Sequence, residues 1–398
     1  MNFSNQENPF IRGSMKSIEL FAGAGGLAIG LHEAGFRPVN VIEWDRYCCD
    51  TIRQNKARGI KVIGQWKLTE GDVRAIDFSV YDGKVKLISG GPPCQPFSLG
   101  GKHGAYTDAR DMFPEAIRAV REARPGAFIF ENVKGLTRAT FRNYFEYIRL
   151  QLEHPDIRPR EEEAWLDHLA RLEQHHTSGS RSGLNYRVVV HLANAANYGV
   201  PQKRERVFFV GFREDLGLRW SFPKETHSRE ALIWDMVHGD YWDRHRVAQR
   251  HRISASSMIA PSEKPVGFQP WRTVRDAIAD LPDPEKSPLT ASPILNHRFQ
   301  PGARSYTGHT GSPLDEPAKT LKAGVHGVPG GENMMRRPDG SVRYFTVRES
   351  ARLQTFPDEY IFHGTWTESM RQLGNAVPVR LARTVGEDIA RHILDAKA

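Results

Sequence analysis

The sequence SIELFAGAGGLA at residues 17–28 decides the fold class. Its apolar first half, residues 17–21, predicts a β-strand, and the glycines that follow predict a tight turn opening a helix. Gly23, Gly25 and Ala28 fit the G-x-G-x-x-G/A fingerprint of a dinucleotide-type binding turn. Glycines allow a sharp turn and a close approach of the backbone to a ligand. This segment therefore predicts the first strand–turn–helix unit of a nucleotide-binding α/β fold.

The rest of the chain repeats this alternation of short apolar runs and helical stretches. Further strands are predicted at 39–43, 85–89, 127–130, 186–191 and 206–212, and helices at 347–356 and 379–396. Strands that alternate with helices indicate an α/β fold with a doubly wound, mostly parallel sheet covered on both faces. Such Rossmann-like sheets bind their ligands at the carboxyl ends of the strands.

Composition divides the chain into four parts. Residues 1–14 are polar and predict a disordered leader, whereas residues 15–217 carry the α/β pattern. Residues 218–345 are rich in Pro, Gly, Trp and His and predict a smaller, irregular domain. Residues 346–398 regain helical periodicity and are expected to complete the first domain. Within that first domain, the charged stretch 141–176 is expected to form a solvated surface helix.

Charge and cysteine usage narrow the function class. The formal net charge of +8 favours an anionic partner such as nucleic acid. The three cysteines, Cys48, Cys49 and Cys94, give neither a disulfide framework nor a metal-binding spacing, so no metal site is expected and a reducing cytosol fits. No apolar run approaches the roughly 20 residues of a membrane span, so no membrane partner is expected.

Two acidic residues follow predicted strands near the glycine turn. Glu43 ends the second strand at the spacing of a ribose-binding acid and is expected to accept hydrogen bonds from two ribose hydroxyls. This pattern fits NAD and S-adenosylmethionine equally. Asp72 follows a third strand, where it either accepts from an adenine amino group or is an ordinary turn residue.

The segment SGGPPCQPFS at residues 89–98 directly follows the predicted strand 85–89. Its two glycines and three prolines impose a stiff, irregular turn. A free cysteine is most often a small buried hydrophobe, but this turn would present Cys94 to a cleft, where its thiolate is a strong nucleophile. The glycine-rich, basic residues 99–104 predict a mobile loop that closes over a phosphate backbone.

The residues GPPCQPFS resemble the catalytic-cysteine motif of the cytosine-C5 DNA methyltransferases. Further segments resemble other motifs of that family in the family's order: Phe21–Gly26, Glu43–Trp44, Glu131–Val133, Gln202–Arg206, Arg348–Gln354 and Gly374–Pro378. Because the matches are ordered and span residues 18–379, the chain is identified as a member of this family of bacterial restriction–modification type.

The resemblance implies a reaction and three catalytic residues. The methyl group of S-adenosylmethionine would pass to carbon 5 of a cytosine flipped out of a specific duplex DNA sequence. Cys94 would attack carbon 6, Glu131 would contact N3 and the exocyclic amino group, and Arg204 would contact the base carbonyl. The base that removes the carbon 5 proton is not identified by the sequence.

The resemblance and the residue chemistry together give the expected contacts. The residues expected to contact the cofactor are Phe21, Ala22, Gly23, Gly25, Gly26, Glu43, Trp44, Asp72, Val73, Pro93, Asn375 and Ala376. The residues expected to contact DNA are Ser98, Lys102, Arg206, Lys322 and Asn333. Residues 218–345 would be the target-recognition domain, in which Lys322 and Asn333 could reach base edges.

The expected partner is double-stranded DNA. The expected protein is a monomer in the bacterial cytosol, associated with the nucleoid and paired with a restriction endonuclease of the same specificity. Three alternatives stay open. A nicotinamide-dependent oxidoreductase would leave the Pro-Pro-Cys turn unexplained, and a non-catalytic DNA-binding protein would not need Cys94, Glu131 and Arg204. The same chemistry on RNA would need less of the region 218–345.

Overall fold

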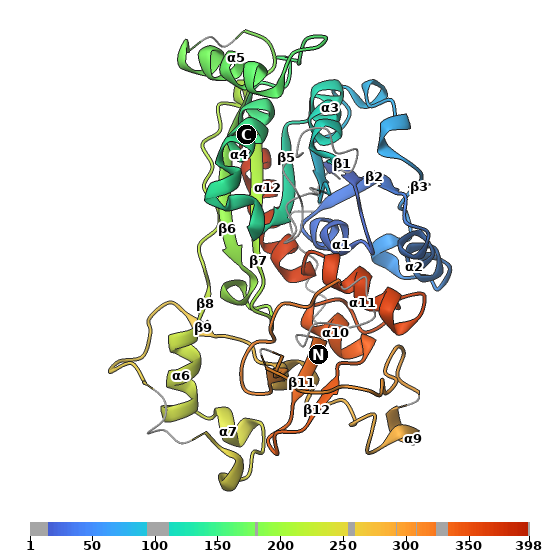
Figure 1. Cartoon of the computed structure of the whole chain (residues 1–398), viewed down its shortest axis with the longest axis vertical. Coiled ribbons are helices and arrows are strands. Elements are labelled where there is room, and N and C mark those ends of the chain that lie inside the picture. Colours follow the sequence, from blue (N-terminus) through green and yellow to red (C-terminus); the bar gives the residue numbers. More distant parts are fainter. Residues whose placement is uncertain are drawn as a thin grey trace.

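The computed structural model describes residues 15–93, 111–179, 182–253, 259–291, 293–307, 309–323 and 333–396. The predicted leader at 1–14 lies outside these residues. The described strands form one large sheet and two small ones, and helices surround the large sheet (Figure 1). This arrangement is the α/β fold that the sequence predicts.

The large sheet has the strand order β3-β2-β1-β4-β5-β7-β6. Its strands are β1 (Met15–Leu20), β2 (Phe36–Glu43), β3 (Leu68–Glu70), β4 (Leu87–Gly90), β5 (Ala127–Val133), β6 (Tyr186–Asn194) and β7 (Glu205–Arg213). Strands β1 to β5 pair in parallel, whereas β7 is antiparallel to both β5 and β6. The mostly parallel sheet is thereby confirmed, and its doubly wound order places β1 and β4 at the centre.

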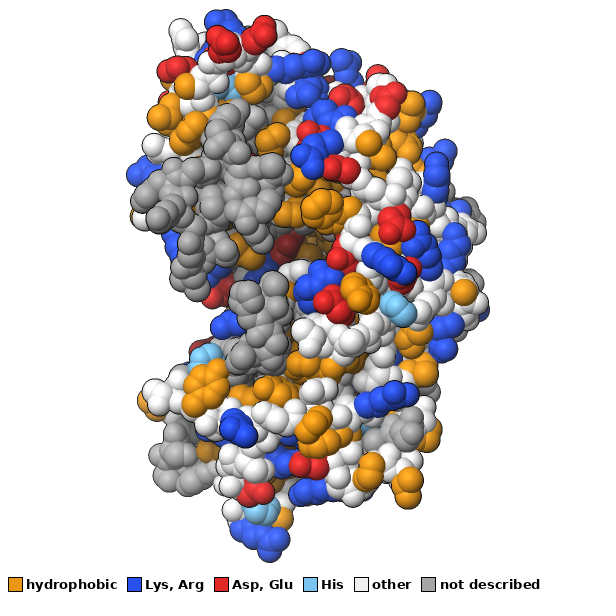
Figure 2. Space-filling view, turned by 45° about the vertical axis from the view of Figure 1, so that its right-hand side comes forward, with side chains coloured by type: hydrophobic (Ala, Val, Ile, Leu, Met, Phe, Trp, Pro, Cys, Tyr) orange, Lys and Arg blue, Asp and Glu red, His pale blue; other side chains and the backbone are white. Residues whose placement is uncertain are grey.

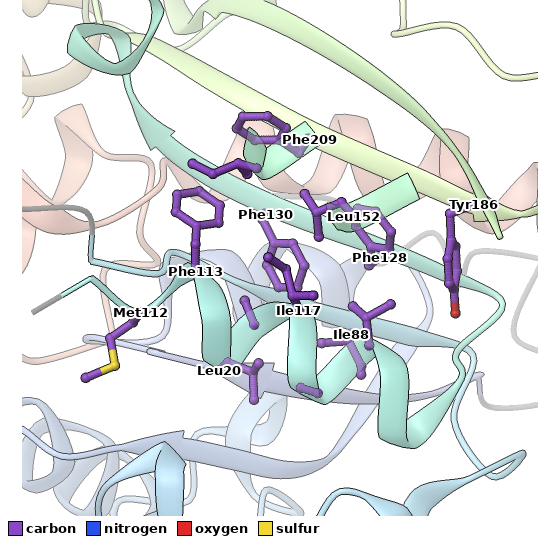
Figure 3. Close-up of a cluster of buried hydrophobic side chains, with 14 of the residues drawn as sticks. Leu20, Ile88, Met112, Phe113, Ile117, Phe128, Phe130, Leu152, Tyr186 and Phe209 are labelled. Carbon is purple, nitrogen blue, oxygen red and sulfur yellow. The ribbon is translucent and has the colours of Figure 1, made fainter. Parts of the chain in front are cut away.

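Each central strand alternates its side chains between two cores. In β5, Phe128 and Phe130 face one core, and Ala127 and Ile129 face the other. The first core is covered by α3 (Phe113–Ala123) and α4 (Arg142–Glu153). Figure 3 shows the phenylalanines of β5 packed against Phe113 and Ile117 of α3. Strands buried on both faces explain why the sequence shows continuous apolar runs there.

The second core is covered by α1 (Gly26–Glu33) and α12 (Val379–Asp395), which pack against each other. The last helix therefore completes the first domain, as the sequence predicts for this helix. α2 (Arg46–Ala57) begins with a cap in which the Asp45 side chain accepts a hydrogen bond from the Cys48 amide. This cap places the end of β2 and the start of α2 at the same edge of the sheet.

The charged stretch 141–176 does not form the single solvated helix that the sequence predicts. It contains α4 and a separate helix α5 (Trp165–Thr177), joined by residues 154–164. Tyr144 and Tyr147 of α4 are buried in the first core. The expectation was wrong because the apolar residues of α4 recur at helical spacing between charged residues, which masks them in composition.

The second domain consists of short elements with irregular connections. Its elements are α6 (Arg229–His238), α7 (Tyr241–Arg244), α8 (Val274–Ile278), α9 (Pro288–Ala291), β8 (His227–Ser228), β9 (Gln269–Pro270), β10 (Ser312–Pro313), β11 (Met334–Arg336) and β12 (Val342–Tyr344). It lies below the large sheet in Figure 1.

The helices α10 (Val347–Leu353) and α11 (Trp366–Asn375) join the two domains. Val347 and Leu373 share one core with Leu321 of the second domain and Ala28 of α1. The proposed boundary at 345/346 thus falls inside a continuous hydrophobic cluster, and α10 and α11 pack against residues of both domains.

Candidate active site

The glycine turn lies at the carboxyl end of β1 and leaves open space above it. Gly23 and Gly25 have positive φ angles of 55° and 85°, a region in which side chains are strained. A Cβ atom added at Gly23 would meet no atom within 4 Å, so the space above this residue is open to a ligand. Phe21, which is half-buried, also has a positive φ of 53°. A strained residue beside an open turn is a feature typical of binding sites.

The next two glycines of this unit serve packing instead. A Cβ at Gly26 would lie 2.4 Å from the carbonyl oxygen of Val377, and one at Gly30 would lie 2.4 Å from that of Val379. The buried Ala376 therefore lies directly against the turn, and the exposed Asn375 precedes it. The structure thus brings the predicted C-terminal motif beside the predicted cofactor turn.

Glu43 joins the turn to the end of β2. Its Oε2 accepts a hydrogen bond from the Gly23 amide (2.6 Å), and its Oε1 accepts from the amides of Trp44 (2.9 Å) and Asp45 (2.8 Å). A carboxylate has about four acceptor positions, so one position on Oε2 is left for a ligand. The sequence led us to expect hydrogen bonds from two ribose hydroxyls, and the backbone amides that occupy the other positions reduce this to one.

Trp44 is the exposed aromatic residue at this edge. Its side chain follows the Glu43 carboxylate directly and is 67% exposed. An indole that is exposed beside a buried carboxylate offers a flat surface on which an adenine can stack. The side chains of Asp72 and Val73 are less available for contact with a cofactor. Both Asp72 oxygens pair with the Arg74 side chain, which lowers the pKa of Asp72, and the Val73 side chain is buried in the first core.

The turn that leads to Cys94 is fixed at three described residues. A Cβ at Gly90 would lie 2.5 Å from the Leu20 carbonyl oxygen, so the ends of β1 and β4 pack too closely for any other residue. The Pro92 carbonyl accepts a hydrogen bond from the Asn132 side chain (2.9 Å), and the exposed Pro93 accepts one from the Met112 amide (3.0 Å). Cys94, Ser98 and Lys102 lie outside the described residues.

Glu131 lies beside this turn. A Cβ added at Gly91 would be 3.4 Å from Glu131 Oε2. The carboxyl group is buried and forms an ion pair with Arg206, with 2.7 Å between Oε1 and Nε. Burial raises the pKa of Glu131, and the nearby charges of Arg206 and Arg204 offset this only in part. The site therefore contains a buried carboxyl group with an elevated proton affinity, and it lies beside Gly91, three residues before the predicted nucleophile.

Arg206 is held by this ion pair. Its side chain is 12% exposed and its guanidinium also donates to the Glu205 carbonyl. Burial lowers its pKa, and Glu131 opposes that shift. A DNA-binding role for Arg206, as the sequence predicts, would require an exposed guanidinium. In the structure the guanidinium instead pairs with the carboxyl group of Glu131.

Arg204 is fully buried at the junction of the domains. Its guanidinium donates to the carbonyl oxygens of Leu321 (3.3 Å) and Gly374 (2.8 Å), while its Nε has no hydrogen-bond partner among the described residues. A buried charge with an unpaired donor is costly unless something else satisfies it. Arg204 thus connects the second domain to α11 and keeps one donor for another group.

Two buried glutamines extend this junction, and the sequence analysis did not single out either one. Gln202 accepts a hydrogen bond from the Leu321 amide (3.0 Å) and donates to Gln354 Oε1 (3.2 Å). Gln354 in turn donates to the Ala376 carbonyl (3.2 Å) beside the glycine turn. Both glutamines lie within motifs that the resemblance identified, and this position was the only indication in the sequence that they belong to the site.

The two predicted base-reading residues lie at the ends of one loop. Asn333 is buried, and its side chain both accepts from the Lys322 amide and donates to the Lys322 carbonyl, at 3.0 Å each. These two bonds resemble a strand pairing and close the base of the segment 323–332, most of which lies outside the described residues. Because both polar atoms of Asn333 are used here, its side chain holds the loop rather than extending to a base.

Figure 2 shows that the molecular surface is hollowed between the large sheet above and the second domain below. Gly23 follows the carboxyl end of β1, Gly90 ends β4, and Glu131 lies near the carboxyl end of β5; these are the strand ends nearer the second domain in Figure 1. None of the described helices combines the length and the hydrophobicity that crossing a lipid bilayer requires.

The chain is similar to known proteins over most of its length. Residues 15–156 and 179–391 match the family model of the C-5 cytosine-specific DNA methylases. The Type II methyltransferase M.Eco47II of Escherichia coli is 32% identical over 95% of this chain and 79% of its own length. M.NgoMIV of Neisseria gonorrhoeae is 32% identical over 94% of this chain and 97% of its own.

Solved structures share the fold. A putative DNA modification methyltransferase encoded within an E. coli prophage has a TM-score of 0.58 and 21% identity, and covers 96% of this chain and 100% of its own. The Dnmt2 methyltransferase of S. pombe has a TM-score of 0.56 at 18% identity, with the same coverage. The chain belongs to the C-5 cytosine-specific DNA methylase family and is a DNA (cytosine-5-)-methyltransferase with S-adenosylmethionine as its methyl donor.

Proposed function

We propose that Cys94 is the nucleophile and that Glu131 is its partner at the cytosine ring. The observation that carries this proposal is the contact between two turns. Pro92, two residues before Cys94, is hydrogen-bonded to Asn132, and Gly91 lies against the Glu131 carboxyl group. Gly91, three residues before Cys94, therefore lies beside the buried carboxyl group.

Carbon 5 of cytosine is a weak nucleophile and must be activated. A bond from the Cys94 sulfur to carbon 6 moves electron density to carbon 5 and N3, which splits one difficult step into two easier ones. A Glu131 carboxyl group whose pKa is raised by burial can donate a proton or a hydrogen bond at N3 as negative charge develops there. After methylation, loss of the carbon 5 proton returns the electrons and the carbon–sulfur bond breaks.

The residues at the glycine turn fit S-adenosylmethionine. Gly23 leaves open space, Glu43 Oε2 keeps one acceptor position for a ribose hydroxyl, and the Trp44 indole is exposed for the adenine. When bound, this group supplies an electrophilic methyl group on a sulfonium sulfur. We assign Gly25, Gly26 and Ala376 to shaping the turn, and Asp72 to its pair with Arg74.

Arg204 and Arg206 have different functions in this proposal. Arg206 offsets part of the pKa shift of Glu131 and fixes the orientation of its carboxyl group. Arg204 holds the Leu321 and Gly374 carbonyls and keeps Nε for the reacting base or for the segment that carries Cys94.

The second domain is proposed to recognise the DNA sequence. Residues 218–345 face the hollow from below, and the loop whose base Lys322 and Asn333 close is proposed to enter a groove. The flipped cytosine would occupy the hollow. Since the relatives carry Type II methyltransferase names, we also propose a monomer that acts in a bacterial cytosol at the nucleoid, beside a restriction endonuclease of the same specificity.

A mechanism-based trap tests the proposal. Duplex DNA in which 5-fluorocytosine replaces cytosine cannot lose a proton from carbon 5, so the enzyme and S-adenosylmethionine should form an adduct that survives denaturation. Cys94→Ser is expected to bind the same DNA without forming the adduct. An adduct of equal yield in Cys94→Ser would reject Cys94 as the nucleophile. RNA of the same sequence serves as the substrate control, and an equal yield of adduct with RNA would contradict the proposed selectivity for duplex DNA.

A further inference from the structure

Three metal-ligand side chains converge far from the hollow, at the ends of α4 and α5. Glu153 is the last residue of α4, His154 follows it, and His176 lies in the last turn of α5. One nitrogen of each imidazole and one oxygen of the carboxylate lie within 4.8 Å of one another. In Figure 1 this end of the molecule is at the top, opposite the second domain. The cluster is therefore separate from the proposed active site.

The spacing of the ligand atoms fits a small tetrahedral ion. His176 Nδ1 lies 3.2 Å from His154 Nε2 and 3.2 Å from the nearer Glu153 oxygen, Oε2. Nitrogen and oxygen ligands at about 2.0–2.1 Å from a tetrahedral Zn²⁺ lie about 3.3 Å apart. These two separations match this edge, whereas the third, between His154 Nε2 and Glu153 Oε2, is bounded only at 4.8 Å and would have to be close to the same length when the ion is bound.

The tautomer of His154 is set by a neighbouring amide. Asn185 Nδ2 donates to the carbonyls of Ser182 and Gly183, so its Oδ1 faces His154 Nδ1 at 2.8 Å. A carbonyl oxygen only accepts, and Nδ1 must therefore carry the proton. The lone pair of His154 is left on Nε2, which faces the cluster. A hydrogen bond from the other ring nitrogen is the usual support of a metal-binding histidine.

The Glu153 carboxylate is oriented in the same way. Its Oε1 pairs with Arg149, which leaves Oε2 to face the cluster. The residue is 93% buried, since its exposed fraction is 7%, and Oε2 forms no hydrogen bond with the described residues; its recorded neighbour is His176 Nδ1 of the same cluster, at 3.2 Å. A buried carboxylate oxygen with no hydrogen bond is costly. It becomes favourable when a cation occupies the space that it faces.

We propose that Glu153, His154 and His176 bind one Zn²⁺ ion, with water as the fourth ligand. Two imidazoles and one carboxylate suit this ion. The ion would join the ends of α4 and α5 and, through Asn185, the start of β6 at Tyr186. Its function is to stabilise this helix pair, and it takes no part in methyl transfer.

Metal binding by the full-length protein tests the proposal. The protein is treated with a chelator, exchanged into metal-free buffer and titrated with Zn²⁺ in competition with a chromophoric chelator. We expect one tight equivalent. His176→Ala should weaken it by at least about tenfold, and Asn185→Ala by about 10- to 100-fold. His176 is suited to substitution because its side chain is 44% exposed, and His238→Ala, on α6, is the matched control.

Two further readouts separate binding from folding. Co²⁺ in place of Zn²⁺ should give the visible absorption of a tetrahedral site in the wild type and in His238→Ala, and lose it in His176→Ala. Zn²⁺ should also raise the melting temperature of the wild type but not that of His176→Ala, because a ligand stabilises only the state that binds it. The proposal is rejected if the wild type binds Zn²⁺ no more tightly than His176→Ala does. In that case a proton on His176 Nδ1, shared with the other two groups, holds the cluster together.

Discussion

The Nε of Arg206 on β7 lies 2.7 Å from Oε1 of Glu131 on β5, and the arginine side chain is 12% exposed whereas the glutamate is buried. Burial raises the pKa of Glu131, and the arginine is among the charges that limit that rise. The pKa of Glu131 therefore depends in part on a residue that the sequence motif alone assigns to DNA binding.

Replacing Arg206 by glutamine should change the pH dependence of methylation. Without the guanidinium, the pKa of Glu131 rises further, so the carboxyl group keeps its proton to higher pH. If the protonated form is active, the alkaline limb of the pH–rate profile moves to higher pH. Breaking a buried pair also costs about 3–5 kcal/mol of stability. Methyl transfer to duplex DNA measured across pH checks the first effect, and urea unfolding checks the second.

Lys134→Gln is the control for this experiment. Lys134 forms an ion pair with Glu205 at the same edge of the sheet, but both side chains are about half exposed. Such pairs contribute about 0–1 kcal/mol, so its profile and stability should equal those of the wild type. An unchanged alkaline limb in Arg206→Gln would contradict the proposed function of Arg206.

Removing the Trp44 indole should weaken cofactor binding without changing stability. The side chain is 67% exposed, so Trp44→Ala removes little buried surface. Loss of a base–aromatic stack costs about 1–3 kcal/mol, which is about 5- to 150-fold in the dissociation constant of S-adenosylmethionine. Equilibrium dialysis of labelled cofactor measures this. Leu166→Ala, an exposed residue on α5, should bind cofactor normally, and equal affinity in both variants would remove Trp44 from the site.

Two glycine substitutions should separate binding from packing at the same turn. Gly23→Ala places a methyl group in open space at a positive φ, so cofactor affinity should fall while the protein loses only about 1–2 kcal/mol. Gly26→Ala forces a methyl group against the Val377 carbonyl and should destabilise by about 1–3 kcal/mol or more. Melting temperature and cofactor binding are measured on both. A larger loss of stability in Gly23→Ala than in Gly26→Ala would contradict these assignments.

Glu19 should make the protein less stable as the pH rises. The residue is buried in β1, accepts a hydrogen bond from Ser89, and has its pKa raised by burial from 4.5 to about 8. Between these values the folded state holds the proton and the unfolded state does not. The free energy of unfolding should therefore fall with rising pH by up to about 1.4 kcal/mol per pH unit from this group.

Glu19→Gln removes this titration but keeps the shape of the side chain. Urea unfolding at about pH 5.5 and about pH 7.5 should show a smaller difference between the two pH values in the variant than in the wild type. An equal difference in both proteins would mean that Glu19 is ionised in the folded state. The same buffers suit the Arg206 experiment, so the two titrations can be compared directly.

The fold could be predicted from the sequence because its central strands are buried on both faces. The predicted strands at 127–130 and 206–212 contain continuous runs without polar side chains, at 127–130 and 207–212, and both became strands of the large sheet. The stretch 141–176 was misjudged because charged residues separate the apolar positions of α4. Helical periodicity, not composition, would have shown that Tyr144 and Tyr147 face the core.

The motifs indicated which segments lie together, but not which polar atoms are already hydrogen-bonded within the protein. Sequence spacing placed Glu43 at the glycine turn, and the structure agrees. It could not show that backbone amides occupy three acceptor positions of that carboxylate, or that Asn333 is bonded at both polar atoms to Lys322. These are local backbone contacts, and they depend on turn geometry that residue types do not determine.

The contact between Gly26 and Val377 has a consequence for biosynthesis. The turn at residues 23–26 is among the first parts of this domain to leave the ribosome, but the surface that it packs against is made more than three hundred residues later. A nascent chain cannot complete this turn before residues 376–379 emerge. A chain released before these residues are made therefore lacks the surface that covers the turn, however well its sheet has formed.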